Sequence, residues 1–482
     1  MPQSPITQLS AVDLSVQIAN KNLSCVEVMQ AYLAQIDRFN PQVNAIVSAV
    51  DSESLLQQAQ EKDQELARGR YFGRLHGLPM APKDLTATKG IATTLGSPLL
   101  KNQTNLSDSL MVERLRQSGA ILIGKTNVPE FGLGSHTYNK LFGTTLNAYD
   151  QTKSAGGSSG GAAVSLALNM LPVADGSDFG GSLRNPAAWN NVYGMRPSRG
   201  RVPAISPELF YDHFSTEGPM ARNVQDLAML LSIQSGYDAR VPLSLTEDPK
   251  GFTGNLETSV AGKKIAWLGN YQNYLPMEEG LLDALEASFS YFKDLQVQVE
   301  PAQVNFPLEQ LWECWLVLRA FITGGKLGSL YQTPANRELM KPEAIWEIEQ
   351  SLQYSAVDVY QASVKRSNWY RAITQLFGQY DYLLLPAAQV MPFDTAMDWP
   401  KNIAGKTMDT YHRWMEVVIG PTMAGLPVLA IPAGSLHGLP IGFQLIGKPQ
   451  AELDLLHLGY AWQQATPYLQ NRPSILSEGF RQ

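Results

Sequence analysis

The alternation of apolar and polar positions divides the chain into helical and strand-rich segments. Near the N-terminus, Ser10-x-x-Asp13 and Ser24-x-x-Glu27 each place a helix N-cap before a carboxylate and apolar residues at helical spacing. A third helix is predicted over Ser54 to Arg68. From Gly77 to about Arg201, short apolar runs such as Leu-Pro-Met-Ala-Pro and Ala-Ile-Leu-Ile alternate with helical stretches. This rhythm is typical of a layered α/β protein with buried strands.

The second half of the chain is at first more helical and then returns to strands. Residues 260–375 contain one predicted strand at Lys264–Leu268 and predicted helices at Glu278–Leu295 and Leu308–Leu327. Three later apolar runs, which begin at residues 380, 427 and 441, predict strands, and a closing helix is expected near Glu452–Gln463. Because strand-rich segments lie on both sides of the helical region, we expect one sheet built from both ends of the sequence.

Composition and charge narrow the class of protein. The 482 residues include 37 Lys and Arg against 44 Asp and Glu, a formal charge of −7, which gives no electrostatic case for nucleic acid or anionic membrane partners. Two cysteines are too few for a disulfide framework or a cysteine-rich zinc site. No apolar run reaches the ~18 residues that span a bilayer. No Lys or Arg precedes Lys21, so the start is unlike a signal peptide, and we expect a cytoplasmic protein.

Two short motifs match known patterns in an unsuitable context. Gly119 to Thr126 satisfies the phosphate-loop pattern G-x-x-x-x-G-K-T, but its four intervening residues predict a buried strand instead of a phosphate-binding loop. Gly156 to Gly160 satisfies the nucleophile-elbow pattern G-x-S-x-G and precedes a predicted helix. The residues before it are polar and loop-like, whereas an elbow follows a strand. A plain anion-binding nest fits this glycine-serine loop equally well.

Three segments together carry the candidate chemistry: Gly77–Asp84, Ser154–Gly161 and Asp175–Arg184. Their glycines let backbone N–H groups approach a ligand closely. A serine after Phe-Gly-Gly could therefore attack a carbonyl whose oxyanion meets the N–H groups of Phe179, Gly180, Gly181 and Ser182. Lys83 ends an apolar run, and a lysine desolvated there would have a lowered pKa and could act as a base at neutral pH.

In these segments the chain resembles the amidase signature family, serine hydrolases with a Ser–cis-Ser–Lys triad. Gly77 to Asp84 matches the family's G-[LIV]-P-x-x-x-K-D segment, Gly156 to Gly161 matches G-G-S-S-G-G, and Gly176 to Arg184 matches G-S-D-x-G-G-S-[ILV]-R. Further family-like segments, from Gly124 to Gly447, follow in family order. The resemblance implies an α/β fold with one large mixed β-sheet sandwiched between α-helices.

The resemblance also implies a division into regions within a single domain that covers residues 1–482. Residues 1–70 would form the N-terminal helices and 71–205 the signature core. Residues 260–375 would form a helical insert region, and 376–482 would supply the C-terminal strands and helix that complete the sheet. A homodimer is left open.

The mechanism implied by the family is acyl transfer without a metal or other cofactor. Neutral Lys83 would accept a proton through Ser158, which follows a cis peptide bond, and Ser182 would attack the amide carbonyl. The N–H groups from Phe179 to Ser182 would hold the oxyanion, and water would hydrolyse the acyl-enzyme. The supporting residues would be Ser159, which adds a hydrogen bond to the network, and Asp178 and Arg184, which brace the loop.

The choice of amide is less constrained, because family members hydrolyse many amides. One branch is the glutamine-hydrolysing A subunit of a tRNA-dependent amidotransferase. The chain lacks the Gly-x-Glu-Val-x-Arg-Arg segment common in that branch, and it has Phe179 where the branch usually has Thr. We expect a stand-alone amidase for a small apolar or aryl amide, with anilides, esters and carbamates compatible. The amidotransferase branch is the alternative.

Pocket residues follow from the family motifs alone. Phe131 and Gly132 are expected to pass beside the catalytic serines, Tyr138 to lie toward the acyl site, and Trp414 to wall the other side. These aromatic side chains fit sheet packing as well as they fit substrate binding. Trp189 departs from the smaller residues that many members have, which changes the expected shape of the neighbouring pocket.

Overall fold

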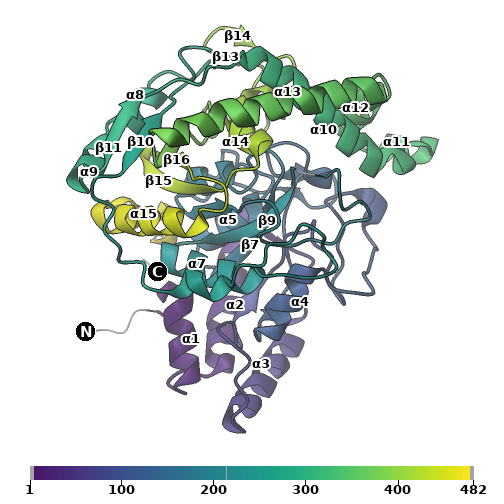
Figure 1. Ribbon diagram of the computed structural model, residues 1–482. Helices are drawn as coiled ribbons and strands as arrows, with labels where there is room; N and C mark the ends of the chain where they lie inside the picture. Colours follow the sequence, from purple (N-terminus) through teal and green to yellow (C-terminus); the bar gives the residue numbers. More distant parts are fainter. Residues whose placement is uncertain (1–4, 213, 478–482) are drawn as a thin grey trace.

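An eight-stranded sheet forms the centre of the protein, which we describe from a computed structural model for residues 5–212 and 214–477 (Figure 1). The strand order is β11-β10-β12-β16-β15-β8-β9-β7. The strands are β7 (Val173–Asp178), β8 (Tyr193–Arg196), β9 (Thr216–Ala221), β10 (Lys264–Trp267), β11 (Gln298–Pro301), β12 (Tyr382–Pro386), β15 (Val428–Leu436) and β16 (Leu439–Ile446). The predicted single sheet with strands from both ends of the sequence is therefore confirmed.

The sheet is mixed, as the resemblance implied. β10 pairs in parallel with β11 and β12, and the remaining neighbours pair antiparallel. The join between the two halves of the chain is β8 with β15, where Arg196 lies opposite Val428. In β7 and β9, Ser177 lies opposite Glu217, which places their side chains on the same face of the sheet. This edge of the sheet carries the candidate site.

Helices from both halves pack against the sheet. α5 (Gly160–Ala167) contacts β7 and β9, α6 (Asn185–Trp189) contacts β15 and β16, and α15 (Glu452–Ala465) contacts β15. Figure 1 shows β15 and β16 between α14 (Ile419–Ala424) and α15. α5 is buried along its whole length, and its glycines and alanines let the backbone approach the strands closely.

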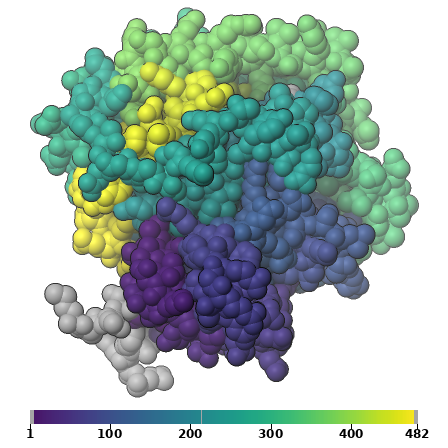
Figure 2. Space-filling model, turned by 60° about the horizontal axis from the view of Figure 1, so that its bottom comes forward, coloured from purple at the N-terminus to yellow at the C-terminus, as the bar shows by residue number. Residues whose placement is uncertain are grey.

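The N-terminal helices form as the capping motifs predict. α1 (Ala11–Ala19) starts after Ser10, and α2 (Cys25–Val43) starts after Ser24 in a complete capping box with Glu27. α3 (Ser52–Ala67) starts two residues before its predicted position. Figure 2 shows this segment, in purple, packed against the part of the chain that follows it. Buried Asp226 on α7 (Val224–Gln234) accepts hydrogen bonds from the first two N–H groups of α1 and so ties it to the body of the protein.

The helical region adds a third layer and two strands. α10 (Leu308–Tyr331) packs against α12 (Pro342–Ser351) and α13 (Ala356–Gln375). The other α-helices of the described residues are α4 (Leu110–Gln117), α8 (Leu281–Glu286), α9 (Phe289–Asp294) and α11 (Pro334–Leu339). In the part of the chain that the structure describes, no helix combines the length and the apolar character that crossing a bilayer requires.

Several elements differ from the prediction, which assigned no helix or strand between residues 202 and 259, where β9 and α7 lie. The helix expected over Glu278–Leu295 is two helices, α8 and α9, because the chain breaks at Ser288, whose hydroxyl donates to Leu285 O. Strand β11 was not predicted, because it is a short edge strand without buried residues. The two early apolar runs form β2 (Pro79–Met80) and β3 (Ile121–Leu122), which pair with each other outside the large sheet.

The remaining short strands are β1 (Ile46–Val47), β4 (Lys125–Thr126), β5 (Tyr138–Asn139), β6 (Gly143–Thr144), β13 (Asn402–Ile403) and β14 (Lys406–Thr407). Because strands from both halves share one sheet, we propose that the chain is one domain with the predicted regions. Residues 1–4 and 478–482 of that predicted domain lie outside the described residues.

Candidate active site

Lys83 lies at the centre of the site with no exposed surface. It follows β2, and a β-bridge to Thr126 of β4 fixes its backbone beside that strand. The Nζ atom donates to Ser158 Oγ and Ser159 Oγ, both at 2.8 Å, and lies 3.1 Å from the carbonyl and hydroxyl oxygens of Ser177. The structure therefore brings Lys83 together with the two serines of the glycine-rich loop, as predicted.

The surroundings of Lys83 lower the proton affinity of its amine. Burial lowers the pKa of its ammonium to about 7, against the opposing effect of the Asp178, Asp175 and Glu217 carboxylates. At neutral pH a large share of the side chain is then the free amine. A neutral amine keeps a lone pair that can accept a proton from one of the serine hydroxyls around it.

Ser158 precedes helix α5, and the Gly157–Ser158 peptide bond is cis, as the resemblance implied. The chain beside it is close: a Cβ atom on Gly132 would lie 3.6 Å from Ser158 Oγ, and Gly132 has a φ of +71°. The prediction that Phe131 and Gly132 pass beside Ser158 agrees with this geometry. Ser159 also donates to Ser177 O at 3.5 Å, so it connects the loop to β7.

Ser182 lies in the turn between β7 and α6 and is 6% exposed. It lines the same cavity as Ser158, but no hydrogen bond joins the two hydroxyls among the described residues. Of the four predicted oxyanion donors, the N–H of Gly181 instead donates to Asp178 Oδ1 at 2.9 Å. The N–H groups of Phe179, Gly180 and Ser182 have no acceptor in the described part of the protein. Three of the four predicted donors are therefore free for a ligand.

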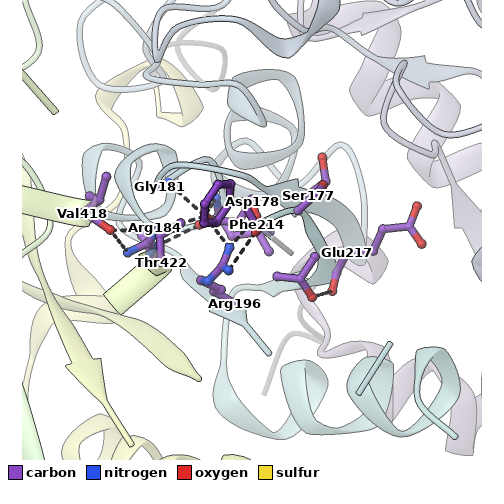
Figure 3. A network of polar contacts seen from close by, with 12 residues as sticks. Ser177, Asp178, Gly181, Arg184, Arg196, Phe214, Glu217, Val418 and Thr422 are labelled. Carbon is purple, nitrogen blue, oxygen red and sulfur yellow. Dashed lines mark hydrogen bonds and ion pairs between the residues drawn. The ribbon is translucent and has the colours of Figure 1, made fainter. Parts of the chain in front are cut away.

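Asp178 and Arg184 brace this turn from below (Figure 3). The Asp178 carboxylate accepts from the N–H groups of Gly181 and Leu183, and Arg184 donates to both of its oxygens at 2.8 and 2.9 Å. Arg196 adds a third charged contact at 3.1 Å. Burial by itself would raise the pKa of Asp178, but the two guanidinium groups lower it well below its usual range. The carboxylate thus stays charged and fixes the positions of the N–H groups around Ser182.

The cavity in front of these residues has a volume of about 470 Å³. Its lining includes Ser158, Ser182 and the predicted Phe131 and Gly132. The rest of the lining is mixed. Its apolar side chains include Leu85, Leu95, Leu133, Phe179, Val202, Ile322, Leu327 and Met415, and its charged side chains are Arg199, Glu208, Asp212, Glu217, Arg319 and Lys326. The cavity can therefore surround an apolar group and also meet polar groups of a ligand.

Two predicted pocket residues lie elsewhere. Trp414 is 1% exposed and stacks on Trp189 at 6.0 Å between ring centroids, so both indoles belong to the core and not to the cavity lining. Tyr138 lies outside the lining, and its hydroxyl donates to Glu343 at 3.4 Å. The large residues at these positions pack against other parts of the chain. The departure at Trp189 therefore does not reshape this cavity.

Several residues of the site were not predicted. Glu217 of β9 lines the cavity beside Ser177, and its Oε2 atom is buried without a hydrogen-bond partner among the described residues. Burial and the nearby Asp175 carboxylate raise the pKa of Glu217 to about 8. Arg319 of α10 also lines the cavity, although it lies more than 100 residues after Ser182 in the sequence. No motif or predicted strand marks Glu217 in the sequence, and Arg319 lies within the apolar run Trp315–Ile322.

The phosphate-loop pattern has a structural role here. Its residues form β3 and β4, and the buried Lys125 donates to Thr86 O at 2.5 Å and to Thr88 Oγ1 at 2.8 Å. Burial lowers the pKa of Lys125 to about 8. The ammonium of Lys125 thus donates to acceptors within the protein.

The fold and the site define an α/β enzyme that combines serine hydroxyls, a buried lysine and a row of backbone donors. The model of the amidase family matches residues 27–456, and the chain belongs to this family, the amidase signature enzymes.

Comparison with known proteins gives relatives of two kinds. The A subunit of the Glutamyl-tRNA(Gln) amidotransferase of Nitrosococcus oceani is 30% identical over 96% of this chain and 99% of its own. A bacterial aryl acylamidase of known structure superposes with a TM-score of 0.92 at 30% identity, over 98% of this chain and 99% of its own. The A subunit of the Glutamyl-tRNA(Gln) amidotransferase of Thermotoga maritima superposes with a TM-score of 0.79 at 25% identity, over 97% of each chain.

We predict that the activity depends on pH through Lys83. The value of kcat/KM should rise through pH ~7 as the ammonium loses its proton and should level off above it. Asp175→Asn should move this acid limb to lower pH, because it removes a carboxylate that stabilises the ammonium. The measurement is a pH profile of kcat/KM for both proteins, with Asp283→Asn on the exposed surface of α8 as the control. An unmoved limb in Asp175→Asn would contradict the assignment to Lys83.

We predict that Asp178→Asn destabilises the protein by about 3–5 kcal/mol, because it leaves the buried Arg184 and Arg196 without their shared counter-charge. Denaturant unfolding followed by tryptophan fluorescence measures this change. Asp238→Asn removes a carboxylate from a solvent-exposed ion pair with Arg240 and should have little effect. Equal stability of the two variants would show that the buried network does not hold the turn.

Proposed function

We propose that this protein hydrolyses a carboxamide C–N bond through an acyl-enzyme on Ser182. Neutral Lys83 accepts a proton from Ser158 while Ser158 accepts the proton of Ser182, whose Oγ then bonds to the carbonyl carbon. The N–H groups of Phe179, Gly180 and Ser182 stabilise the oxyanion. The proton returns through Ser158 to the departing amine, and water hydrolyses the ester in the same way. The observation that carries this proposal is the buried Lys83 within 2.8 Å of Ser158 Oγ.

For the substrate we propose a small apolar or aryl amide, with Ser159, Asp178 and Arg184 in supporting roles. The apolar side chains among the lining of the 470 Å³ cavity support it, because an apolar acyl or aryl group gains free energy by leaving water against them. The TM-score of 0.92 to a bacterial aryl acylamidase also supports it. Anilides, esters and carbamates present the same carbonyl to the oxyanion donors.

A second candidate is the glutamine-hydrolysing A subunit of a tRNA-dependent amidotransferase. The curated relatives favour this candidate over the first, since proteins that carry the name of this amidotransferase component align with nearly the whole chain at 30–32% identity. Such a protein would act together with partner chains. Glutamine carries an α-carboxylate and an α-ammonium, so this candidate requires charged groups in the cavity that are free to bind both.

We predict that wild-type protein hydrolyses anilides of small acyl groups faster than it hydrolyses free glutamine. The readouts are aniline and ammonia release, compared as kcat/KM, with aliphatic amides, esters and carbamates in the same panel. Glutamine turnover above all other amides would favour the second candidate instead.

Ser182→Ala should lower kcat by at least ~10³-fold, because it removes the attacking oxygen. Ser232→Ala on α7, whose hydroxyl donates to Met229 O outside the cavity, is the matched control and should keep wild-type turnover. Mass spectrometry after reaction with a fluorophosphonate should find the label on Ser182. A label on another residue, or full turnover in Ser182→Ala, would overturn the acyl-enzyme proposal.

A further inference from the structure

Arg319 is a buried cation in the wall of the cavity that contains Ser158 and Ser182. It lies on α10 and is 4% exposed. Its guanidinium lies 5.3 Å from the ring centroids of both Phe179 and Trp315. A buried charge must be matched by partners, so the hydrogen bonds of Arg319 determine what it can bind.

Glu347 of α12 balances the charge of Arg319. The Nε atom of Arg319 donates to Glu347 Oε1, and its Nη2 atom donates to the Tyr411 hydroxyl oxygen at 2.5 Å. The Tyr411 hydroxyl donates in turn to Glu347 Oε1 at 2.6 Å. Glu347 is 1% exposed, so solvent does not weaken this pair. The guanidinium is therefore held in place, and its ion pair with Glu347 has no net charge.

The remaining donors of Arg319 are unused by the protein. A guanidinium has five N–H groups, and no acceptor for Nη1 occurs among the described residues. Because Arg319 lines the cavity, the free N–H groups are available to a bound molecule. N–H groups that the protein leaves unpaired at a cavity donate to water or to a ligand.

We infer that Arg319 is a specificity-determining residue that donates hydrogen bonds to a neutral acceptor, such as a second carbonyl oxygen, on the amide substrate. This inference rests on the proposed function and narrows its substrate class. The acceptor is neutral because Glu347 already supplies the negative charge, and a substrate carboxylate would meet a pair without net positive charge. The preferred substrate is therefore an apolar amide with one additional carbonyl, on either side of the scissile bond.

Matched amides test the inference. On the acyl side, 4-oxopentanoyl anilide is compared with 4-methylpentanoyl anilide and with succinyl anilide, which carries a carboxylate. On the amine side, the acetamide of 4-acetylaniline is compared with that of 4-isopropylaniline. We expect the ketone of at least one pair to have a kcat/KM about tenfold higher than its hydrocarbon analogue. Equal values for both pairs would overturn the inference.

Two variants assign the preference to Arg319. Arg319→Met together with Glu347→Gln removes the donor without leaving a buried charge, and the ketone preference should fall to about one. Glu347→Gln alone leaves the guanidinium unbalanced, and the kcat/KM of succinyl anilide relative to 4-oxopentanoyl anilide should rise by about tenfold. Lys365→Met is the control, because Lys365 on α13 pairs with Glu313 of α10 at a half-exposed position and lies outside the cavity lining. It should keep the wild-type ratios.

The outcomes separate this inference from the proposed function. Ser182-dependent hydrolysis without a ketone preference overturns the role of Arg319 and leaves the amidase proposal intact. Without Ser182-dependent hydrolysis, the proposed function fails, and calorimetry with Ser182→Ala then compares the binding of the ketone and hydrocarbon amides directly. Equal binding overturns the inference. Unchanged ratios in the double variant, or in Glu347→Gln when the double variant does not fold, also overturn it.

Discussion

The burial of the Lys83 ammonium among serine hydroxyls is the constraint on which the site depends. Removal from water favours the free amine, the carboxylates nearby favour the ammonium, and their balance places the pKa of Lys83 at about 7. An exposed lysine would remain charged at neutral pH and could not accept a proton from Ser158. The segments that contact Lys83, which are β4, β7 and the loop with Ser158 and Ser159, therefore contribute to the proposed chemistry through the solvent they exclude.

Asp178 connects the base to the turn that carries Ser182. Arg184 and Arg196 keep it charged, and among the carboxylates it has the largest effect on Lys83, whose pKa it raises against the effect of burial. The same carboxylate takes the N–H of Gly181 and leaves the N–H groups on either side for an oxyanion. One buried acid thus acts on both parts of the site: it offsets part of the effect of burial on the Lys83 pKa, and it fixes the turn that carries the oxyanion donors.

The parts of the structure that could be predicted are those that residues close together in the sequence determine. Helix α2 follows its capping box, and Lys83, Ser158 and Ser159 meet as the motifs imply. Prediction from the sequence fails where an element packs against a partner that is far away along the chain. The apolar runs of β2 and β3 predict buried strands, yet the sequence does not show that they pair outside the main sheet. Trp414 was predicted at the cavity, but aromatic residues satisfy a core equally well, and only its contact with Trp189 distinguishes the two.

The wall of the cavity shows why substrate choice is harder to predict than chemistry. The glycine-rich segments that carry the serines are local, and their spacing limits the geometry they can adopt. The role of Arg319, in contrast, depends on hydrogen bonds to residues far away in the sequence, Glu347 on another helix and Tyr411. Taken alone, an arginine within an apolar run of a helix could equally reach solvent. Only the packing of α10 on α12 makes it a neutralised donor in the cavity, so a few substitutions in these helices can change the substrate while the catalytic geometry stays the same.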